Sequence, residues 1–206
     1  MSLHQHNDSI ICFKHCTSAS IFCKKIPQEC PICKNNLSAL PLDPVIIPYP
    51  LTNVVDNQSC CCLVIKPTEG CFLCDYSIND DLHIGVTNSR SDVIEYDKSG
   101  LVKCDNHMWK NCVAIQLIPI SWQIFWDEML SIVCNDSNWH TANYNELKYN
   151  CFTFVISFLK NINYPSAKFT SKEDLCKILI LPKIQSVLKY STVYRHLVSK
   201  DFYIQE

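Results

Sequence analysis

The chain has 206 residues, 48% of them hydrophobic, and a formal net charge of −2. This length and composition suffice for one sizeable core with a small appendage, whereas the near-neutral charge excludes the basic surface that nucleic acid or an anionic membrane requires. Because the only three glycines are Gly70, Gly85 and Gly100, a glycine-rich phosphate-binding loop of the P-loop or dinucleotide-binding kind is excluded as well.

The N-terminus predicts no secretory signal, because residues 1–8 are polar and the apolar run that follows ends at Phe13. The longest candidate for a membrane span, residues 113–126, is too short and is interrupted by polar residues and a proline. We therefore expect an intracellular protein, cytoplasmic or nuclear. In a reducing compartment its 15 cysteines serve metal binding, catalysis or core packing rather than disulfides.

Residues 9–37 are cysteine-rich, and we predict that they form a separate zinc-ribbon-like module. Cys30 and Cys33 have the spacing at which a tight turn directs both sulfurs to one tetrahedral metal. This pair supplies half of a site, and the segment has no second such pair; the other half must come from Cys12, His15, Cys16 or Cys23. We predict a structural zinc site whose ligands are His15, Cys16, Cys30 and Cys33. Cys12 is the substitute if one of these residues is not a ligand. The alternative is a cysteine-rich hairpin without metal.

Residues 38–59 are predicted to be a connector. Prolines in this segment block regular pairing and favour an extended chain: Pro41, Pro44, Pro48 and Pro50. The second predicted domain then covers residues 60–206.

The second domain opens with predicted strands at residues 60–65 and 71–76, followed by a hairpin of residues 81–88 and 92–100. Apolar and polar residues alternate in both arms of the hairpin. This period places His83 on one face of the first arm and Glu95 on one face of the second, where a carboxylate can orient the imidazole and stabilise its charged form. The cysteines of this region are predicted to be core residues: Cys60, Cys61, Cys62, Cys71 and Cys74.

A further strand is predicted at residues 112–118, followed by an amphipathic helix capped by Ser121. Large side chains repeat at helical spacing in this segment: Trp122, Phe125, Trp126, Met129, Leu130 and Val133. Such an aromatic stripe indicates core rather than a cofactor site.

Residues 149–159 are the most informative segment. Asn150 is a favoured N-cap, which places Cys151 at the first helical position, where unpaired backbone N–H groups and the helix dipole favour a thiolate. The following residues are apolar on nearly all sides, so the helix is expected to be buried. Cys151 is then either a small core residue or a nucleophile that pairs with His83. His107 and His140 are expected to be surface residues, although either can replace Glu95 as the third member of such a site.

The C-terminal part is predicted to cover the core. A capping box at residues 171–174 begins a short helix that is predicted to end at Pro182. A last helix follows over about residues 184–198, and residues 202–204 are predicted to form an edge strand.

Two of these segments resemble a known group of proteins. The strand sequence His83-Ile84-Gly85-Val86 and the helix start Asn150-Cys151-Phe152-Thr153-Phe154-Val155 are similar to circularly permuted papain-like proteins. These include lecithin-retinol acyltransferase-like enzymes, PPPDE-type isopeptidases and, with the cysteine first in the chain, NlpC-type peptidases. The resemblance covers residues 63–162. It implies that His83 is the general base, Cys151 the nucleophile and Glu95 the orienting residue.

The whole chain also resembles the vertebrate makorin opposite-strand family. This resemblance rests on five segments of the chain, residues 13–16, 64–70, 81–88, 123–130 and 150–158. It implies no activity.

The sequence thus predicts an α+β protein: the N-terminal cysteine-rich module and a permuted papain-like domain whose antiparallel sheet packs on the Cys151 helix. We predict a thiol-dependent hydrolase or acyltransferase acting on an ester or amide bond, with His83 accepting the Cys151 proton and N–H groups at the helix start stabilising the oxyanion. The alternative is a non-catalytic scaffold whose zinc module binds a protein partner.

Overall fold

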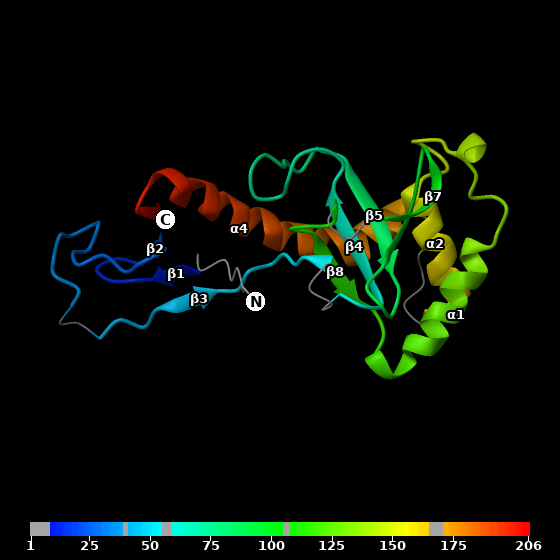
Figure 1. Cartoon of the computed structure of the whole chain (residues 1–206). Coiled ribbons are helices and arrows are strands. Elements are labelled where there is room, and N and C mark those ends of the chain that lie inside the picture. The colour runs from blue at the N-terminus through cyan, green and yellow to red at the C-terminus, as the bar shows by residue number, and fades with distance from the viewer. Residues whose placement is uncertain (1–8, 39–40, 55–58, 105–107, 165–170) are drawn as a thin grey trace. The chain divides into compact units, whose positions relative to one another are not determined.

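The computed structural model describes residues 9–38, 41–54, 59–104, 108–164 and 171–206 (Figure 1). The fold is α+β, with two antiparallel sheets and a few helices. The chain divides into two compact units. The first unit consists of Met1–Pro50 and Val187–Glu206, and the second unit consists of Leu51–Ser186. No helix within the described ranges is both long enough and apolar enough to span a membrane.

The first unit is built on a four-stranded antiparallel sheet in the order β3-β1-β2-β9. Its strands are β1 (Ile10–Phe13), β2 (Ser20–Cys23), β3 (Val45–Ile47) and β9 (Phe202–Gln205). The predicted C-terminal edge strand is confirmed as β9. Because β9 pairs with β2 along its whole length, residues 187–206 group with the N-terminal unit, whereas the sequence analysis placed them with the second domain.

The second unit contains a five-stranded antiparallel sheet in the order β7-β6-β5-β4-β8. The strands are β4 (Cys62–Pro67), β5 (Leu82–Thr87), β6 (Val93–Asp97), β7 (Gly100–Cys104) and β8 (Val113–Gln116). The predicted hairpin is confirmed as β5 and β6, with Val86 opposite Ile94. One core cluster of this unit is formed by Val54, Cys62, Val64, Val93, Trp109 and Cys112.

The strand predicted at residues 71–76 is wrong, because these residues form a hydrogen-bonded turn. The Asp75 carboxylate accepts a hydrogen bond from the Cys71 N–H at 2.7 Å, and the Tyr76 N–H donates to the Cys71 carbonyl at 3.2 Å. Phe72 and Tyr76 pack edge to face and are buried. Cys61 and Cys62 are core residues as predicted, but Cys74 is exposed and Cys71 is half-buried.

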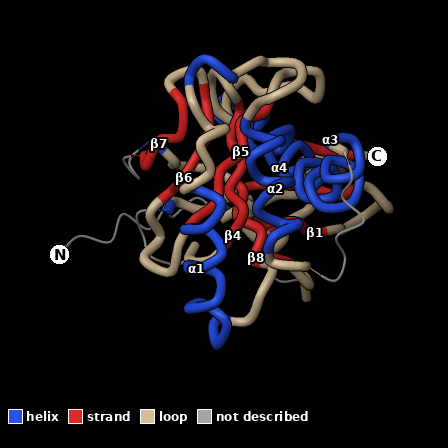
Figure 2. The backbone as a smooth tube through the Cα atoms, turned by 90° about the vertical axis from the view of Figure 1, so that its right-hand side faces the viewer, coloured by secondary structure: helices blue, strands red, loops and turns tan. Residues whose placement is uncertain are grey.

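Helix α2 (Cys151–Asn161) covers the sheet of the second unit, and α1 (Gln123–Cys134) lies beside it (Figure 2). Helix α2 packs against β5 and β6, and α1 packs against α2. The residues of α1 that are buried lie at helical spacing: Trp126, Leu130 and Val133. Ser121 does not cap α1, since it lies in a short 3-10 turn, η3 (Ile120–Trp122), that precedes the helix. The predicted stripe is wrong at its start, where Trp122 and Phe125 are exposed.

The predicted helix end at Pro182 is also wrong. Ser171 accepts a hydrogen bond from the Asp174 N–H and begins α3 (Lys172–Leu175). The chain then passes through a π-helical turn, η5 (Cys176–Ile180), into α4 (Leu181–Ser199). Pro182 therefore lies where the π-helical turn meets α4, and the chain stays helical through it.

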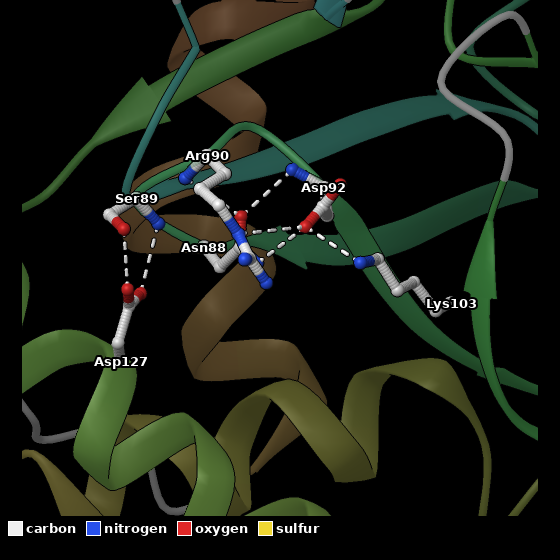
Figure 3. Close-up of polar contacts among 6 residues, drawn as sticks. All are labelled: Asn88, Ser89, Arg90, Asp92, Lys103 and Asp127. Atoms are coloured by element: carbon white, nitrogen blue, oxygen red, sulfur yellow. Dashed lines mark hydrogen bonds and ion pairs between the residues drawn. The ribbon is translucent and has the colours of Figure 1, made fainter.

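The turn that joins β5 to β6 is fixed by polar contacts from two other elements (Figure 3). The Asn88 side chain accepts hydrogen bonds from the backbone N–H groups of residues 90 and 92. Asp127 of α1 accepts a hydrogen bond from the Ser89 N–H at 2.9 Å, and Lys103 of β7 pairs with Asp92 at 2.8 Å. These contacts hold the β5–β6 hairpin, which carries His83 and Glu95, in place.

Candidate functional site

The helix start at Asn150 is the first part of the candidate site. The Asn150 side chain accepts a hydrogen bond from the Phe152 N–H at 3.0 Å, and the Thr153 hydroxyl accepts one from the Asn150 N–H at 3.3 Å. This reciprocal cap confirms that Cys151 is the first helical residue. Cys151 is 5% exposed, so its thiol lies at a buried helix N-terminus.

The β5–β6 hairpin supplies the second part. His83 Nε2 lies 2.8 Å from Glu95 Oε2, and the two side chains are only 15% and 9% exposed. The Cys151 thiol lies close enough to the His83 ring to raise the pKa of the imidazole. The structure therefore brings together the three residues that the sequence analysis singled out: Cys151, His83 and Glu95.

Electrostatics favour an ion pair between His83 and Glu95. Burial of His83 opposes its charged form, but the hydrogen bonds and charges of Cys151 and Glu95 outweigh burial and raise its pKa from 6.5 to about 9. Burial likewise acts to raise the pKa of Glu95, but hydrogen bonds from His83 and Cys104, with the charges of His83 and Lys66, lower it overall. At neutral pH the pair is thus an imidazolium and a carboxylate.

Three residues around this pair were missed by the sequence analysis. The Cys104 thiol donates a hydrogen bond to Glu95 Oε1, and burial together with Glu95 raises the pKa of Cys104 to about 12. The Trp109 ring lies 6.0 Å from the His83 ring, and Lys66 Nζ lies 4.7 Å from the centre of the Trp109 ring. The only signal for Lys66 is its position opposite His83 in the sheet, which requires knowledge of the strand register.

Of the two alternative third residues, His140 is exposed and is not part of the site. Its backbone carbonyl accepts a hydrogen bond from the Tyr96 hydroxyl. His107 lies outside the described residues. Glu95 is therefore the third residue of the described site.

The ion pair predicts a specific pH dependence for the stability of the second unit. Because the folded-state pKa of His83 is raised, the stabilisation is complete below pH 6.5 and is lost as the pH rises through about 9. We expect the free energy of unfolding of the wild type to exceed that of Glu95→Gln by about 1–2 kcal/mol near pH 6, and by much less at a pH of about 10. Urea unfolding followed by tryptophan fluorescence measures this, since all four tryptophans lie in the second unit. An equal difference at both pH values would contradict the ion pair.

The first unit contains a cluster of potential metal ligands. His15 and Cys16 follow β1, and Cys30 and Cys33 follow β2. Their ligand atoms all lie within 4.8 Å of one another. The four residues are those predicted from the sequence, whereas Cys12 and Cys23 are not part of the cluster. Cys23 is a core residue, buried among Phe13, Ile21 and Leu37.

The distances within the cluster fit a tetrahedral metal. Zinc–sulfur bonds of about 2.3 Å and zinc–nitrogen bonds of about 2.0 Å place two sulfurs about 3.8 Å apart, and a sulfur about 3.5 Å from a nitrogen. The Cys16 and Cys30 sulfurs lie 3.9 Å apart, and the Cys33 sulfur lies 3.4 Å from His15 Nδ1. These two pairs fit a tetrahedral site as they stand, and the four ligand atoms, all within 4.8 Å of one another, can bind one metal ion by drawing together around it.

Comparison with known proteins gives a consistent result for both parts of the chain. Residues 8–37 match the family model described as DUF4796 N-terminal, and residues 44–197 match DUF4796 C-terminal. The chain is 28% identical over 204 residues to the MKRN2 opposite strand protein of Homo sapiens, with 96% of this chain and 90% of the human protein covered. No solved structure matches the chain.

Proposed function

This chain belongs to the makorin opposite-strand family described by the DUF4796 models, and we propose that it is a cysteine hydrolase or acyltransferase acting on an ester or amide bond. The observation that carries the proposal is the position of His83, which hydrogen-bonds the Glu95 carboxylate and lies close enough to the Cys151 thiol for that thiol to raise the pKa of the imidazole. A thiol at a helix start, an imidazole and an orienting carboxylate are the groups that thiol-dependent acyl transfer requires.

We propose a role for each group. Since Nε2 of His83 is bonded to Glu95, Nδ1 is the nitrogen that exchanges a proton with Cys151, and the imidazolium described above is the state in which His83 already holds that proton. The thiolate then attacks the carbonyl carbon of the substrate, and His83 returns the proton to the leaving alcohol or amine. Water or a second acceptor resolves the thioester by the reverse sequence of proton transfers.

The oxyanion requires a backbone donor at the helix start. Because the Phe152 N–H already donates to the Asn150 cap, the proposed donor is the N–H of Cys151, which has no acceptor within the helix. The asparagine cap thereby fixes the orientation of the donor and the nucleophile together.

A cavity beside this helix supports an apolar acyl group in the substrate. The cavity has a volume of about 200 Å³ and is lined mainly by apolar side chains, including Tyr76, Leu82, Phe152, Ile180 and Ile184. Cys176 also lines it and lies close enough to Cys151 for their charges to interact. We propose that the acyl group occupies this cavity during the reaction.

We further propose that the second unit is a permuted papain-like domain, as the resemblance of residues 63–162 implies. The order of the elements supports this, because the strand that carries His83 precedes the helix that carries Cys151. The packing of α2 against β5 and β6 also supports it.

For the first unit, we propose a structural zinc ion held by His15, Cys16, Cys30 and Cys33. The set of three sulfurs and one imidazole is typical of closed structural zinc sites, and it leaves no open position for a substrate. The support is the agreement of the two distances with tetrahedral coordination.

A second candidate function is a non-catalytic scaffold that uses the zinc module to bind a protein partner. The observation that favours it is the 5% exposure of Cys151, because a nucleophile must be reached by its substrate. The two candidates differ in whether Cys151 forms an acyl adduct.

The test is incubation of the full chain with thioesters of increasing acyl length, followed by peptide mass spectrometry. The enzyme predicts an acyl adduct on Cys151 that is absent from Cys151→Ala and unchanged in Cys134→Ser, a half-buried thiol of α1 that does not line the cavity. The scaffold predicts that Cys151 is acylated no faster than Cys176.

A further inference from the structure

We propose that Cys71 and Cys74 form a redox-active dithiol that small disulfides oxidise to an intramolecular disulfide. The site lies in the turn between β4 and β5 of the second unit. It is independent of the proposed chemistry at Cys151.

The turn holds the two cysteines in a fixed geometry. The Cys74 N–H donates to the Cys71 sulfur at 3.2 Å, and the Asp75 carboxylate accepts from the Cys71 N–H at 2.7 Å. These contacts resemble those of a helix cap, with Cys71 in the place of the usual serine and the carboxylate one residue later than in a capping box. In such a helical turn the Cα atoms of residues three apart lie about 5 Å from each other, which is within the range that a disulfide spans.

The same turn is anchored on one side and open on the other. The Phe72 and Tyr76 side chains are buried against each other, with ring centres 4.9 Å apart. Cys74, between them, is exposed, and Cys71 is half-buried. The dithiol is therefore presented to solvent on a turn whose apolar side chains, Phe72, Leu73 and Tyr76, belong to the core.

The environment distinguishes this pair from other cysteines of the second unit. Burial raises the pKa of Cys61 and Cys112 to about 12, and that of Cys62 and Cys134 to about 11. Such thiols are poor nucleophiles at neutral pH. Cys71 and Cys74 are instead half-buried and exposed, so that a small disulfide can reach them.

The proposed reaction has two exchange steps. The exposed Cys74 thiolate attacks one sulfur of a small disulfide such as glutathione disulfide, forms a mixed disulfide and releases one thiolate. The Cys71 thiolate then attacks the Cys74 sulfur and releases the second thiolate, leaving a Cys71–Cys74 disulfide. The dithiol loses two protons and two electrons, and the small disulfide is reduced to two thiols.

The test is oxidation of the reduced full chain by glutathione disulfide, with the remaining thiols blocked by alkylation and the products mapped by peptide mass spectrometry. In the wild type we expect a Cys71–Cys74 disulfide that forms at least about tenfold faster than any adduct on Cys134, the half-buried control thiol. Cys71→Ser is the trapping variant, because serine keeps the cap of the turn but cannot resolve the adduct. It should accumulate one glutathione on Cys74.

Cys74→Ser should form neither product, and Cys134→Ser should behave as the wild type. The proposal is overturned if the wild type retains a stable adduct on Cys74, if Cys74 reacts no faster than Cys134, or if either cysteine pairs with another thiol. Peptide mapping of the wild type alone shows whether Cys74 reacts faster than Cys134, even if a variant folds poorly. Tryptophan fluorescence monitors the fold of each variant, because the four tryptophans belong to the same unit.

Discussion

Substitution of Cys33 by serine is expected to release about one zinc ion per chain and to unfold the first unit. The strands of this unit have only three or four residues each, and one core cluster contains five buried residues, Phe13, Ile21, Cys23, Cys30 and Leu37. Structural zinc contributes on the order of 10 kcal/mol to small modules, which is more than so small a core supplies. The measurements are the zinc-to-protein ratio by plasma mass spectrometry and the rate of tryptic cleavage after Lys24 and Lys25.

Cys12→Ser is the matched control for this substitution. Cys12 is a half-buried thiol of β1 that lies outside the ligand cluster, so its removal should leave the zinc content unchanged. Tryptophan fluorescence should be the same in both variants, because the first unit has no tryptophan. A Cys33→Ser protein that retains zinc and resists trypsin like the wild type would exclude a structural metal at this cluster.

Replacement of His83 by alanine is expected to slow acylation of Cys151 by about 10²–10⁴-fold, the usual contribution of a general base. His83 is the residue that links the thiol to the Glu95 carboxylate, so its loss removes both the proton acceptor and the orienting contact. The rate is measured as the appearance of the thioester adduct on Cys151 by intact-protein mass spectrometry.

His140→Ala serves as the control, since this histidine is exposed and outside the site. Its acylation rate should equal that of the wild type. If His83→Ala and His140→Ala acylate Cys151 equally fast, His83 is not the base and the pairing with Cys151 is structural only.

Features set by residues close in sequence could be predicted. The alternation of apolar residues in the hairpin indicated β5 and β6, and the Asn150 cap indicated the start of α2, because both depend on local backbone geometry. The four potential metal ligands were found from the spacing of Cys30 and Cys33 together with the nearby His15 and Cys16. Even the adjacent pair His15 and Cys16, which requires an awkward turn, lies in the cluster.

Features set by long-range pairing could not be predicted. Lys66 is opposite His83 only because β4 pairs with β5 in one particular register, and Cys104 reaches Glu95 from a third strand. The pairing of β9 with β2 joins the two ends of the chain, which no local pattern indicates. The apolar residues around Cys71 suggested a strand, but the Asp75 carboxylate captures the Cys71 N–H and closes a turn instead.

The most direct test of the central claim, that Cys151 is a nucleophile activated by His83, is its alkylation by iodoacetamide as a function of pH. Peptide mass spectrometry resolves each thiol, so the other 14 of the 15 cysteines are internal controls. At pH 6 an ordinary thiol is less than about 1% ionised. We expect iodoacetamide to alkylate Cys151 at least about tenfold faster than Cys134 or Cys176 in the wild type, but not in His83→Ala. A Cys151 that reacts no faster than these two thiols, or is not alkylated in the folded protein, would contradict the enzyme and favour the scaffold.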